Sequence, residues 1–297
     1  MEFRNIRADD EAAFKRLAAE TQNSSYNFIT NYVWGGDDLK IAIEDDCIFL
    51  LWNINGSIFM QYPIGKGDTK KAAQKAVEFF NDRLHMPARF TSLCKQNLSE
   101  LEELFPNSFT VFADRDNFDY IYFSESLAAL SGKKLHAKRN HANRFYRTNN
   151  YHYRRMTRAD AQKCKRLFML WLSEKTGDDP FLKRSCKATF KLLDSVGSFG
   201  LVGGVIDVGG EIVACSVGEK THTDTALIHA EFANTAFEGS YAAINQQFVL
   251  NEWQGVKYIN REEDMGDEGL RKAKLSYQPA LLLKEYCAFQ TEGEKVH

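Results

Sequence analysis

The sequence predicts an α+β protein in which mixed, mainly antiparallel sheets are flanked by helices. Two hairpin signals support this class, because short apolar runs meet across the turns Asn55-Gly56 and Gly209-Gly210. From Asp160 onward the expected elements follow the order helix, hairpin, strand, helix, strand, helix, strand. Helices and strands that occur in this order are typical of the α+β class.

The two halves of the chain resemble one another. When Phe3 to Leu17 is aligned with Tyr153 to Leu167, at an offset of 150, an arginine, an aspartate and a Lys-Arg-Leu triplet recur at matching positions. The offset is half of the 297 residues, where a duplicated domain would repeat. So few identities can also arise by chance, and unrelated halves stay an alternative. We expect an N-terminal domain over 1–125, a basic connector helix over 126–150 and a C-terminal domain over 151–297.

The first half has short apolar or alternating runs that predict strands, and apolar residues at helical spacing that predict helices. The expected strands are Phe3–Ile6, Ile41–Ile43, Cys47–Trp52, Ile58–Tyr62, Arg89–Leu93, Phe109–Phe112 and Tyr120–Phe123. Asp9 or Asp10 caps a first helix, and Thr69 to Leu84 forms an amphipathic helix. Ser99 and Glu102 form a capping box before a third.

The second half continues with the same two patterns. Helices are expected from Asp160 to about Lys175, from Pro180 to Leu193, from Gly239 to Trp253 and from Gly269 to Pro279. The expected strands are Gly200–Asp207, Glu211–Glu219, Thr225–Phe232, Val256–Ile259 and Leu281–Phe289.

Composition narrows the class of protein. The formal net charge of −2 argues against a wholesale nucleic-acid binder. The six cysteines show no CxxC spacing and the N-terminus shows no apolar signal segment, so we expect a cytoplasmic protein with reduced cysteines. No apolar run approaches the roughly 20 residues of a membrane helix, so any lipid substrate would be met at the surface.

Several well-known motifs are missing. The chain has no G-x-x-x-x-G-K-[ST], no G-x-G-x-x-G after a strand, no H-E-x-x-H and no G-x-S-x-G. The sequence therefore disfavours hydride transfer, P-loop chemistry and serine-hydrolase chemistry. The histidines show no metal-ligand spacing, and we expect no metal site.

An acidic turn between a strand and a helix is the first candidate site. The nine positions from Arg261 to Gly269 contain five acids and two glycines. In the helix that follows, Arg271 and Lys274 lie three apart and share a face. Carboxylates at a strand end can accept protons, and aligned cations can hold an anion. A solvated turn before a helix N-terminus is the alternative, since the helix dipole favours acids there.

A basic connector is the second candidate site. From Ser126 to Ala159 there is no acid, whereas nine lysines and arginines and three histidines occur. The core of this stretch, Lys134 to Tyr146, is expected to be helical. A solvated helix face is one reading, but uncompensated like charges destabilise a helix. We therefore expect an anionic partner, most simply the phosphates of a nucleotide, a coenzyme or an RNA.

A third candidate is Glu238-Gly239-Ser240-Tyr241, which follows a strand and opens a helix. Free N–H groups at such a helix start bind phosphate well. Glycine and serine are also ordinary helix-capping residues, so this signal is weak by itself.

Two of these blocks carry a family resemblance. The stretches Lys134–Phe145 and Glu263–Pro279 resemble the uncharacterised bacterial relatives of the phosphatidylglycerol lysyltransferase C-terminal domain, and Gly239 to Asn245 fits that family's glycine-led helix start. The resemblance spans nearly the whole chain. It implies two Gcn5-related N-acyltransferase-like domains in tandem, each a mixed, mainly antiparallel sheet flanked by helices, in agreement with the offset of 150.

The resemblance also implies relatives that move an aminoacyl group from tRNA onto a lipid or a peptidoglycan precursor. The lipid-modifying enzymes carry a large membrane-embedded N-terminal part that this sequence lacks, which puts phosphatidylglycerol as acceptor in doubt. Plain Gcn5-related enzymes use acetyl-CoA, but of their Q/R-x-x-G-x-G/A loop only Gly239 and Ser240 remain.

We therefore expect an acyl or aminoacyl transferase that uses acyl-CoA or aminoacyl-tRNA as donor and an amine or hydroxyl on a small molecule, lipid or cell-wall precursor as acceptor. Glu263 or Asp264 would be the general base, and Arg271 or backbone N–H groups would stabilise the oxyanion. The residues expected to bind the donor and its phosphates are Lys138, Arg139, Asn140, His141, Gly239, Ser240, Tyr241, Arg271, Lys274 and Tyr277.

Two alternatives belong to other classes. A non-catalytic RNA- or nucleotide-binding protein would use the same basic helix. A regulatory protein that has lost its chemistry would show a blocked pocket beside Asp264. The transferase reading requires the cations of the basic connector and the carboxylates of the acidic turn to converge on a shared cavity.

Overall fold

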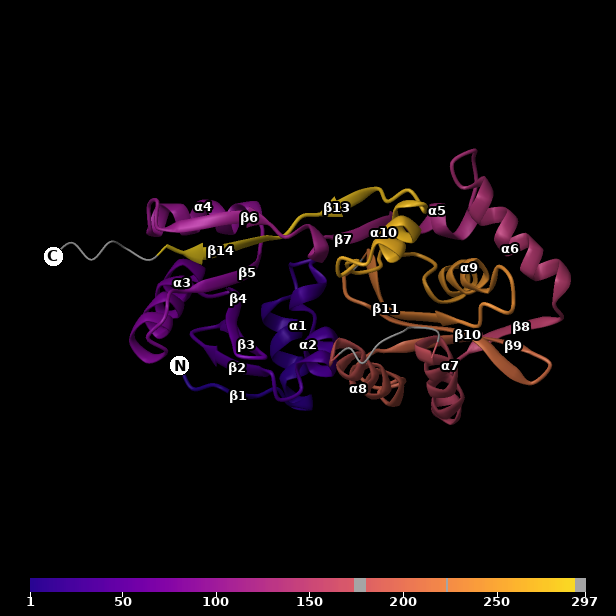
Figure 1. The fold of residues 1–297 in the computed structure, drawn as a ribbon, viewed down its shortest axis with the longest axis horizontal. Coiled ribbons are helices and arrows are strands. Elements are labelled where there is room, and N and C mark those ends of the chain that lie inside the picture. Colours follow the sequence, from indigo (N-terminus) through magenta and orange to yellow (C-terminus); the bar gives the residue numbers. More distant parts are fainter. Residues whose placement is uncertain (174–179, 223, 292–297) are drawn as a thin grey trace. The chain divides into compact units, whose positions relative to one another are not determined.

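The computed structural model describes residues 1–173, 180–222 and 224–291 and divides the chain into two compact units (Figure 1). Unit 1 consists of Met1–Phe118 and Leu283–His297, and unit 2 of Asp119–Leu282. Each unit has a seven-stranded sheet with helices against it. Each sheet contains one parallel pair of neighbouring strands, and the other pairs whose register is known are antiparallel. The parallel pairs are β4 (Ser57–Gly65) with β5 (Arg89–Leu93) and β11 (Thr225–Ala233) with β12 (Tyr258–Asn260). The predicted fold class is thereby confirmed.

The sheet of unit 1 has the strand order β1-β2-β3-β4-β5-β14-β6. Its strands are β1 (Arg4–Asn5), β2 (Leu39–Glu44), β3 (Cys47–Ile54), β4 (Ser57–Gly65), β5 (Arg89–Leu93), β6 (Phe109–Ala113) and β14 (Tyr286–Gln290). Its helices are α1 (Glu11–Leu17), α2 (Phe28–Gly35), α3 (Thr69–Glu78) and α4 (Lys95–Leu104).

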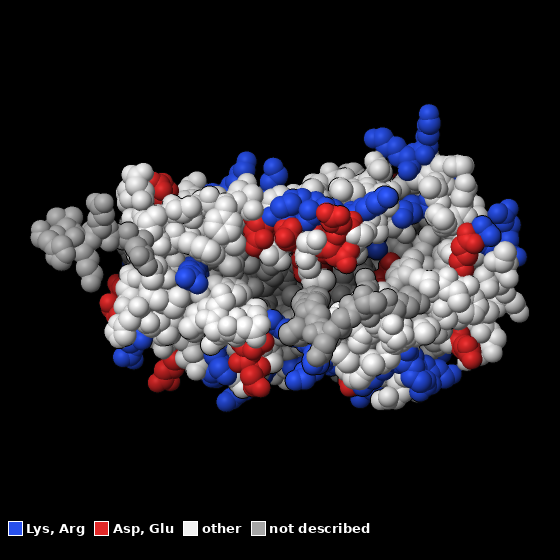
Figure 2. Space-filling model, in the orientation of Figure 1, with Lys and Arg blue, Asp and Glu red and all other residues white. Residues whose placement is uncertain are grey.

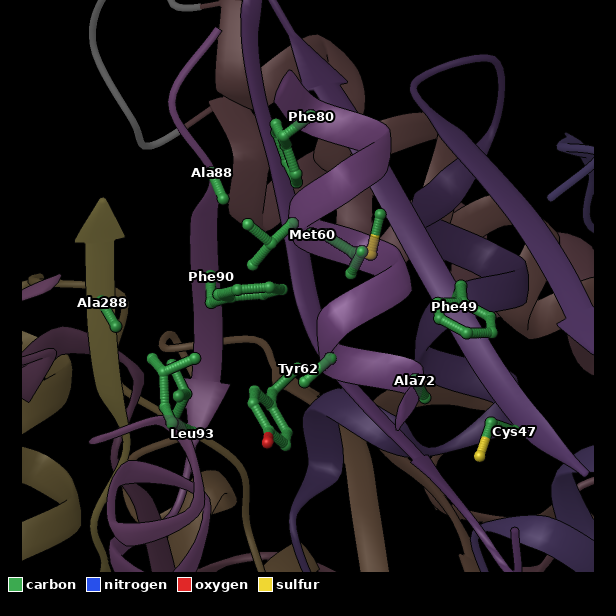
Figure 3. Packing of buried hydrophobic residues seen from close by; sticks show 14 of the residues in the cluster. Cys47, Phe49, Met60, Tyr62, Ala72, Phe80, Ala88, Phe90, Leu93 and Ala288 are labelled. Carbon is green, nitrogen blue, oxygen red and sulfur yellow. The ribbon is translucent and has the colours of Figure 1, made fainter. Parts of the chain in front are cut away.

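The core of unit 1 lies between α3 and the sheet. Ala72, Ala73 and Ala76 are fully or almost fully buried, and these small side chains let α3 approach the strands closely. Aromatic rings fill the space that remains, with the Phe90 ring 5.6 Å from Tyr62 and 6.3 Å from Phe80 in edge-to-face contacts (Figure 3).

One aromatic side chain of unit 1 joins two diverging strands. β4 and β5 pair in parallel only at Met60–Phe90 and Gln61–Thr91. Beyond this point the buried Tyr26 hydroxyl lies 2.8 Å from the Tyr62 carbonyl of β4 and 3.2 Å from the Ser92 carbonyl of β5. The Tyr26 hydroxyl thus bridges the two strands at a point where they no longer share backbone hydrogen bonds.

The sheet of unit 2 has the strand order β13-β7-β12-β11-β10-β9-β8. Its strands are β7 (Asp119–Phe123), β8 (Tyr151–Arg155), β9 (Val202–Val208), β10 (Glu211–Lys220), β11 (Thr225–Ala233), β12 (Tyr258–Asn260) and β13 (Leu281–Leu283). Its helices are α5 (Ser124–Ala129), α6 (His136–Thr148), α7 (Ala161–Ser173), α8 (Pro180–Asp194), α9 (Ser240–Glu252) and α10 (Glu268–Leu275). α9 covers one face of the sheet together with α5 and α6, and α7 packs against α8 and the strands β10 and β11 (Figure 1).

The two units exchange strands. After β6 the chain leaves unit 1 and enters unit 2 as β7, which pairs with β12. After β13 it returns to unit 1 as β14, which lies between β5 and β6. The observed units therefore differ from the expected domains 1–125, 126–150 and 151–297. The connector helix is an integral part of unit 2, and the expected strand Leu281–Phe289 is divided between the two sheets.

The internal repeat is visible as a matched ion pair. In unit 1 the Arg4 guanidinium binds Asp10 through Nη1–Oδ2 (2.9 Å) and Nη2–Oδ1 (2.6 Å), and in unit 2 Arg154 binds Asp160 at 2.7 Å through the same atoms. The Asp10 and Asp160 carboxylates also accept the backbone N–H three residues earlier. Each pair fastens the strand that carries the arginine, β1 or β8, to the start of the helix that follows it.

Other local expectations were wrong. Ser99 and Glu102 do not form a capping box, because α4 begins four residues earlier at Lys95 and the Ser99 hydroxyl donates to the Lys95 carbonyl. The helices α2 and α5 were not expected. The helix predicted to reach Lys175 is observed as far as Ser173, and residues 174–179 lie outside the described residues.

The strand exchange makes a local prediction. Ala288 is fully buried in the core cluster of unit 1, although it lies near the C-terminus. Ala288→Asp would bury an unpaired charge and should destabilise unit 1 by about 3–5 kcal/mol. Hydrogen exchange should then accelerate in β3, β4 and β5 before it does in β10. Thr291→Asp, at an exposed position, is the control, and equal acceleration in both units would contradict the assignment of β14 to unit 1.

Candidate functional site

The acidic turn connects β12 to α10 in unit 2. Glu262, Met265 and Gly266 have positive φ angles of 57°, 52° and 77°, which is costly for the two residues that are not glycine. The turn is held by the buried Lys274, whose ammonium donates to the carbonyls of Arg261 (2.6 Å), Glu262 (3.1 Å) and Glu263. An ammonium has three donors, and all three are used here. Lys274 therefore holds the turn, and it is not placed to bind a phosphate as predicted.

Asp264 is fully buried at the centre of this turn. Its carboxylate accepts hydrogen bonds from the Tyr120 hydroxyl (2.5 Å), from Arg271 Nε (2.9 Å) and Nη2 (2.7 Å) and from the Gly266 amide (3.0 Å). Burial alone would raise the pKa of Asp264, but these hydrogen bonds outweigh burial and lower it to about 2. So weak a base, shielded from solvent, cannot be the proton acceptor that the sequence predicted, and Arg271 is its structural partner.

The pKa of Glu263 is shifted in the direction opposite to that of Asp264. Its side chain is half-buried, and among the described residues no side chain donates a hydrogen bond to its carboxylate. Burial raises the pKa of Glu263 to about 8, and the charges of Glu262 and Asp119 add to the effect while Lys274 opposes it. A carboxyl group that titrates near neutral pH suits proton transfer.

The basic helix and the acidic turn meet at Tyr277. The Lys138 ammonium of α6 lies 4.4 Å from the centre of the Tyr277 ring, and the Arg261 guanidinium lies 4.9 Å from it. Burial lowers the pKa of Lys138, and the charge of Arg261 adds to this while Glu231 opposes it. Within unit 2, Lys138 of the basic helix and Arg261 of the acidic turn thus contact the same ring, and the cavity expected between the two elements stays a prediction.

The sequence analysis missed a polar cluster beside this point. Glu231, in β11, accepts from Arg261 Nη2 through Oε1 (3.0 Å) and from Asn245 Nδ2 of α9 through Oε2 (3.1 Å). Arg261 Nη1 and Asn245 Oδ1 are buried, and neither has a partner among the described residues. One donor nitrogen and one acceptor oxygen are thus left over, and the Arg261 guanidinium lies beside the rings of Tyr122 and Tyr277. The available signal was Asn245, a lone polar residue beside Ile244 on the predicted inward face of its helix.

A buried histidine was also missed. His229 Nδ1 lies 2.9 Å from Glu262 Oε1, and its Nε2 lies 3.1 Å from Glu219 Oε1 of β10. Burial alone would lower the pKa of His229, but the two carboxylates raise it to about 9. His229 is therefore an imidazolium at neutral pH. A single histidine inside an apolar strand gave no signal of this arrangement.

The other residues predicted on α6 have mixed surroundings. Arg139 Nη1 donates to the carbonyls of Leu130 (2.7 Å) and Gly132 (3.3 Å), so it holds the loop before the helix. Asn140 and His141 are exposed. The exposed cations of this region are Lys133, Lys134, Arg144 and Arg147. Figure 2 shows lysine and arginine side chains projecting from the surface over α6.

The predicted helix start at Gly239 serves packing. Gly239 has φ +87°, and a Cβ atom there would lie 2.1 Å from the His141 carbonyl oxygen. Only glycine therefore allows α6 to lie this close to the start of α9. The buried Ser240 hydroxyl donates to the Asn234 carbonyl (3.0 Å), and Tyr241 is half-buried. These contacts give Gly239 and Ser240 structural tasks and place the start of α9 against α6.

With this geometry established, the chain can be compared with known proteins. The family described as "Phosphatidylglycerol lysyltransferase, C-terminal" matches residues 16–289. This chain is a member of the phosphatidylglycerol lysyltransferase C-terminal family. The predicted family is therefore confirmed, and with it the tandem Gcn5-related acyltransferase-like fold.

Solved structures show the same fold. A conserved protein of unknown function from Bacteroides thetaiotaomicron is 33% identical, with a TM-score of 0.90 over 98% of this chain and 100% of that one. L-PGS from Bacillus licheniformis, at 15% identity, has a TM-score of 0.68 over 97% of this chain and 93% of that one. An uncharacterised protein of Mycoplasmoides gallisepticum is 24% identical over 180 residues. The match covers 57% of this chain and 54%, or about half, of that protein.

Three further observations concern the described part of the chain. None of its helices combines the length and the apolar character that crossing a membrane requires. Its histidine, cysteine and acidic side chains form no cluster of three suited to a metal ion. An open cavity of about 460 Å³ lies in unit 1, lined by Met1–Arg4 and Ile41–Glu44, and contains no predicted site residue.

The role of Lys274 in holding the acidic turn can be tested. Lys274→Met removes the ammonium and leaves three carbonyls of the turn without this donor, so the free energy of unfolding should fall by about 1–3 kcal/mol. Lys272→Met, an exposed change in the same helix, is the matched control and should change it by less than about 0.5 kcal/mol. Urea denaturation measures both values. Equal, small effects would show that Lys274 does not hold the turn.

Proposed function

We propose that this protein is an aminoacyl transferase whose donor, an aminoacyl-tRNA, binds to unit 2. The family and the fold support the broader class of acyl and aminoacyl transferases. The observation that carries the narrower proposal is the cluster of Glu231, Asn245 and Arg261, because its unused donor and acceptor fit an acyl group that bears an amine.

The cluster distinguishes the two kinds of donor. An aminoacyl ester carries an ammonium group next to its carbonyl. The ammonium would donate to Asn245 Oδ1 and be attracted by the Glu231 carboxylate, and the ester carbonyl would accept from Arg261 Nη1. An acetyl group has no N–H to offer, so it would leave the buried Asn245 oxygen unpaired at a cost of about 1–3 kcal/mol.

The basic surface of α6 fits the rest of such a donor. Lys133, Lys134 and Arg147 are exposed, and Arg144 pairs with Glu238 at 2.7 Å on the surface. Among the described residues Lys138 has no carboxylate partner, and it lies beside the cluster on the Tyr277 ring. In this proposal the exposed cations contact the tRNA backbone, and Lys138 contacts the phosphate nearest the ester.

The chemistry needs one base and one oxyanion contact. The acceptor, an amine or hydroxyl on a lipid, a cell-wall precursor or a small molecule, attacks the ester carbonyl. Glu263 takes the proton of the attacking group and returns it to the departing ribose oxygen. Arg261 Nη1, fixed by Glu231, stabilises the charge that develops on the carbonyl oxygen. A cytoplasmic location, where charged tRNA occurs, is part of the proposal.

The donor assignment predicts a discrimination. Wild-type protein should bind aminoacyl-tRNA at least tenfold more tightly than deacylated tRNA, measured by fluorescence anisotropy with the mixed charged tRNAs of a bacterium at fixed salt. Asn245→Leu should abolish most of this difference, since it removes the acceptor for the ammonium but no phosphate contact. Asn251→Leu, on the exposed side of the same helix, is the matched control and should leave it unchanged.

The outcomes separate the alternatives. Equal binding of charged and deacylated tRNA, with affinity that falls steeply as salt rises and with no transfer product, would favour the non-catalytic RNA-binding protein. Preferential binding of acetyl-CoA would favour the plain acyltransferase. Either result contradicts the aminoacyl proposal.

The base assignment predicts a pH dependence. Glu263 acts as a base only when ionised, and its raised pKa keeps it mostly protonated below pH 8. The single-turnover transfer rate should therefore rise about tenfold per pH unit between pH 6 and pH 7.5 and approach a plateau above pH 8. Glu263→Gln should lower the rate at least about 100-fold and remove this rise. Retention of the rise in Glu263→Gln would assign it to another group.

A further inference from the structure

The parallel pairing of β11 with β12 ends early. The two strands pair from Thr225–Tyr258 to Leu227–Asn260, whereas β11 continues to Ala233. Past this point two side-chain pairs connect β11 with the turn after β12, His229 with Glu262 and Glu231 with Arg261. The proposed function uses the second pair and assigns no task to the first.

The surroundings of His229 favour a charged ring. Its side chain is 3% exposed, and each ring nitrogen faces a carboxylate oxygen, Glu219 from β10 on one side and Glu262 on the other. A neutral imidazole has a single N–H and would turn a lone pair toward one of these oxygens. The imidazolium donates to both, so it ties the turn to two strands at once.

The residue that His229 holds is one of the two strained residues of the turn. Glu262 has φ +57°, a conformation that costs about 1–2 kcal/mol for a residue other than glycine. Its backbone N–H donates to the Asn260 side chain (2.8 Å), and its carbonyl accepts from Tyr120 (3.2 Å) and from Lys274 (3.1 Å). The His229 contact restrains the side chain of Glu262, and the next residue is Glu263.

We propose that His229 is a positioning residue, clamped as an imidazolium between Glu219 and Glu262, which fixes the left-handed Glu262 and thereby the carboxylate of Glu263. This inference rests on the proposed function, because Glu263 is its general base. The charged groups that face His229 are Glu219 and Glu262, and those that act on Glu263 are Glu262, Asp119 and Lys274.

The proposal adds a second limb to the pH profile. Since the folded-state pKa of His229 is raised to about 9, the clamp is intact below this pH and is lost as the pH rises through it. The transfer rate with mixed aminoacyl-tRNA should rise toward pH 8 and fall above pH 9. His229→Gln should lower kcat at least tenfold, leave the donor KM within twofold and remove the falling limb. His152→Gln, at an exposed position of β8, is the control and should retain both limbs.

A second variant covers the case in which His229→Gln does not fold. Glu219→Gln removes one anion from His229, which lowers the pKa of the ring. The falling limb should then move to lower pH by at least about one unit. A falling limb that is unmoved in Glu219→Gln, or that persists in His229→Gln, would overturn the proposal.

Nuclear magnetic resonance separates this inference from the proposed function. The His229 ring should titrate near pH 9 in the free protein, and the backbone amides of residues 261–264 should shift with the same midpoint. A ring that titrates near 6.5, or turn amides that do not follow it, overturns the clamp whether or not transfer is detected. A missing transfer product together with the expected titration would overturn the proposed function and leave the clamp standing.

Discussion

The site in unit 2 depends on the place where β11 and β12 stop pairing. If the backbone hydrogen bonds between β11 and β12 continued along β11, the N–H and C=O groups of the turn would pair with that strand. No side chains could then lie between the two segments. Because the ladder ends at Leu227–Asn260, charged side chains take over the connection. Glu231 with Arg261 and His229 with Glu262 therefore connect the turn to β11, and Glu231 and Arg261 are also part of the candidate site.

The charged side chains of this region have two kinds of role, one structural and one proposed for binding or catalysis. Asp264 and Lys274 have every strong contact satisfied and serve to hold the turn. Glu263 and Lys138 lack such partners among the described residues, and burial moves the pKa of each toward neutrality. The acids of the turn look alike in the sequence, yet the half-buried Arg271 and the buried Tyr120 make Asp264 a weak base, while its neighbour Glu263 becomes a stronger one.

The sequence was sufficient for features that depend on local pattern. The offset of 150 aligned Arg4 and Asp10 with their counterparts, and the acid-free connector led to Lys138. It was insufficient where the partner of a residue decides its role. A strand such as β14 has the same apolar pattern whichever sheet it joins, so the exchange of strands could not be seen. Asn245 and His229 are single polar residues whose buried partners lie on other elements.

The exchanged strand β14 also constrains how the chain is made. It lies inside the sheet of unit 1, between β5 and β6, but it is synthesised only after the strands and helices of unit 2. While the ribosome is still translating unit 2, unit 1 has a gap in its sheet and two strands with exposed edges. Unit 1 therefore cannot complete its fold before unit 2 has been synthesised, although N-terminal domains generally fold first. The nascent chain must keep these edges from pairing elsewhere until β14 has emerged from the ribosome.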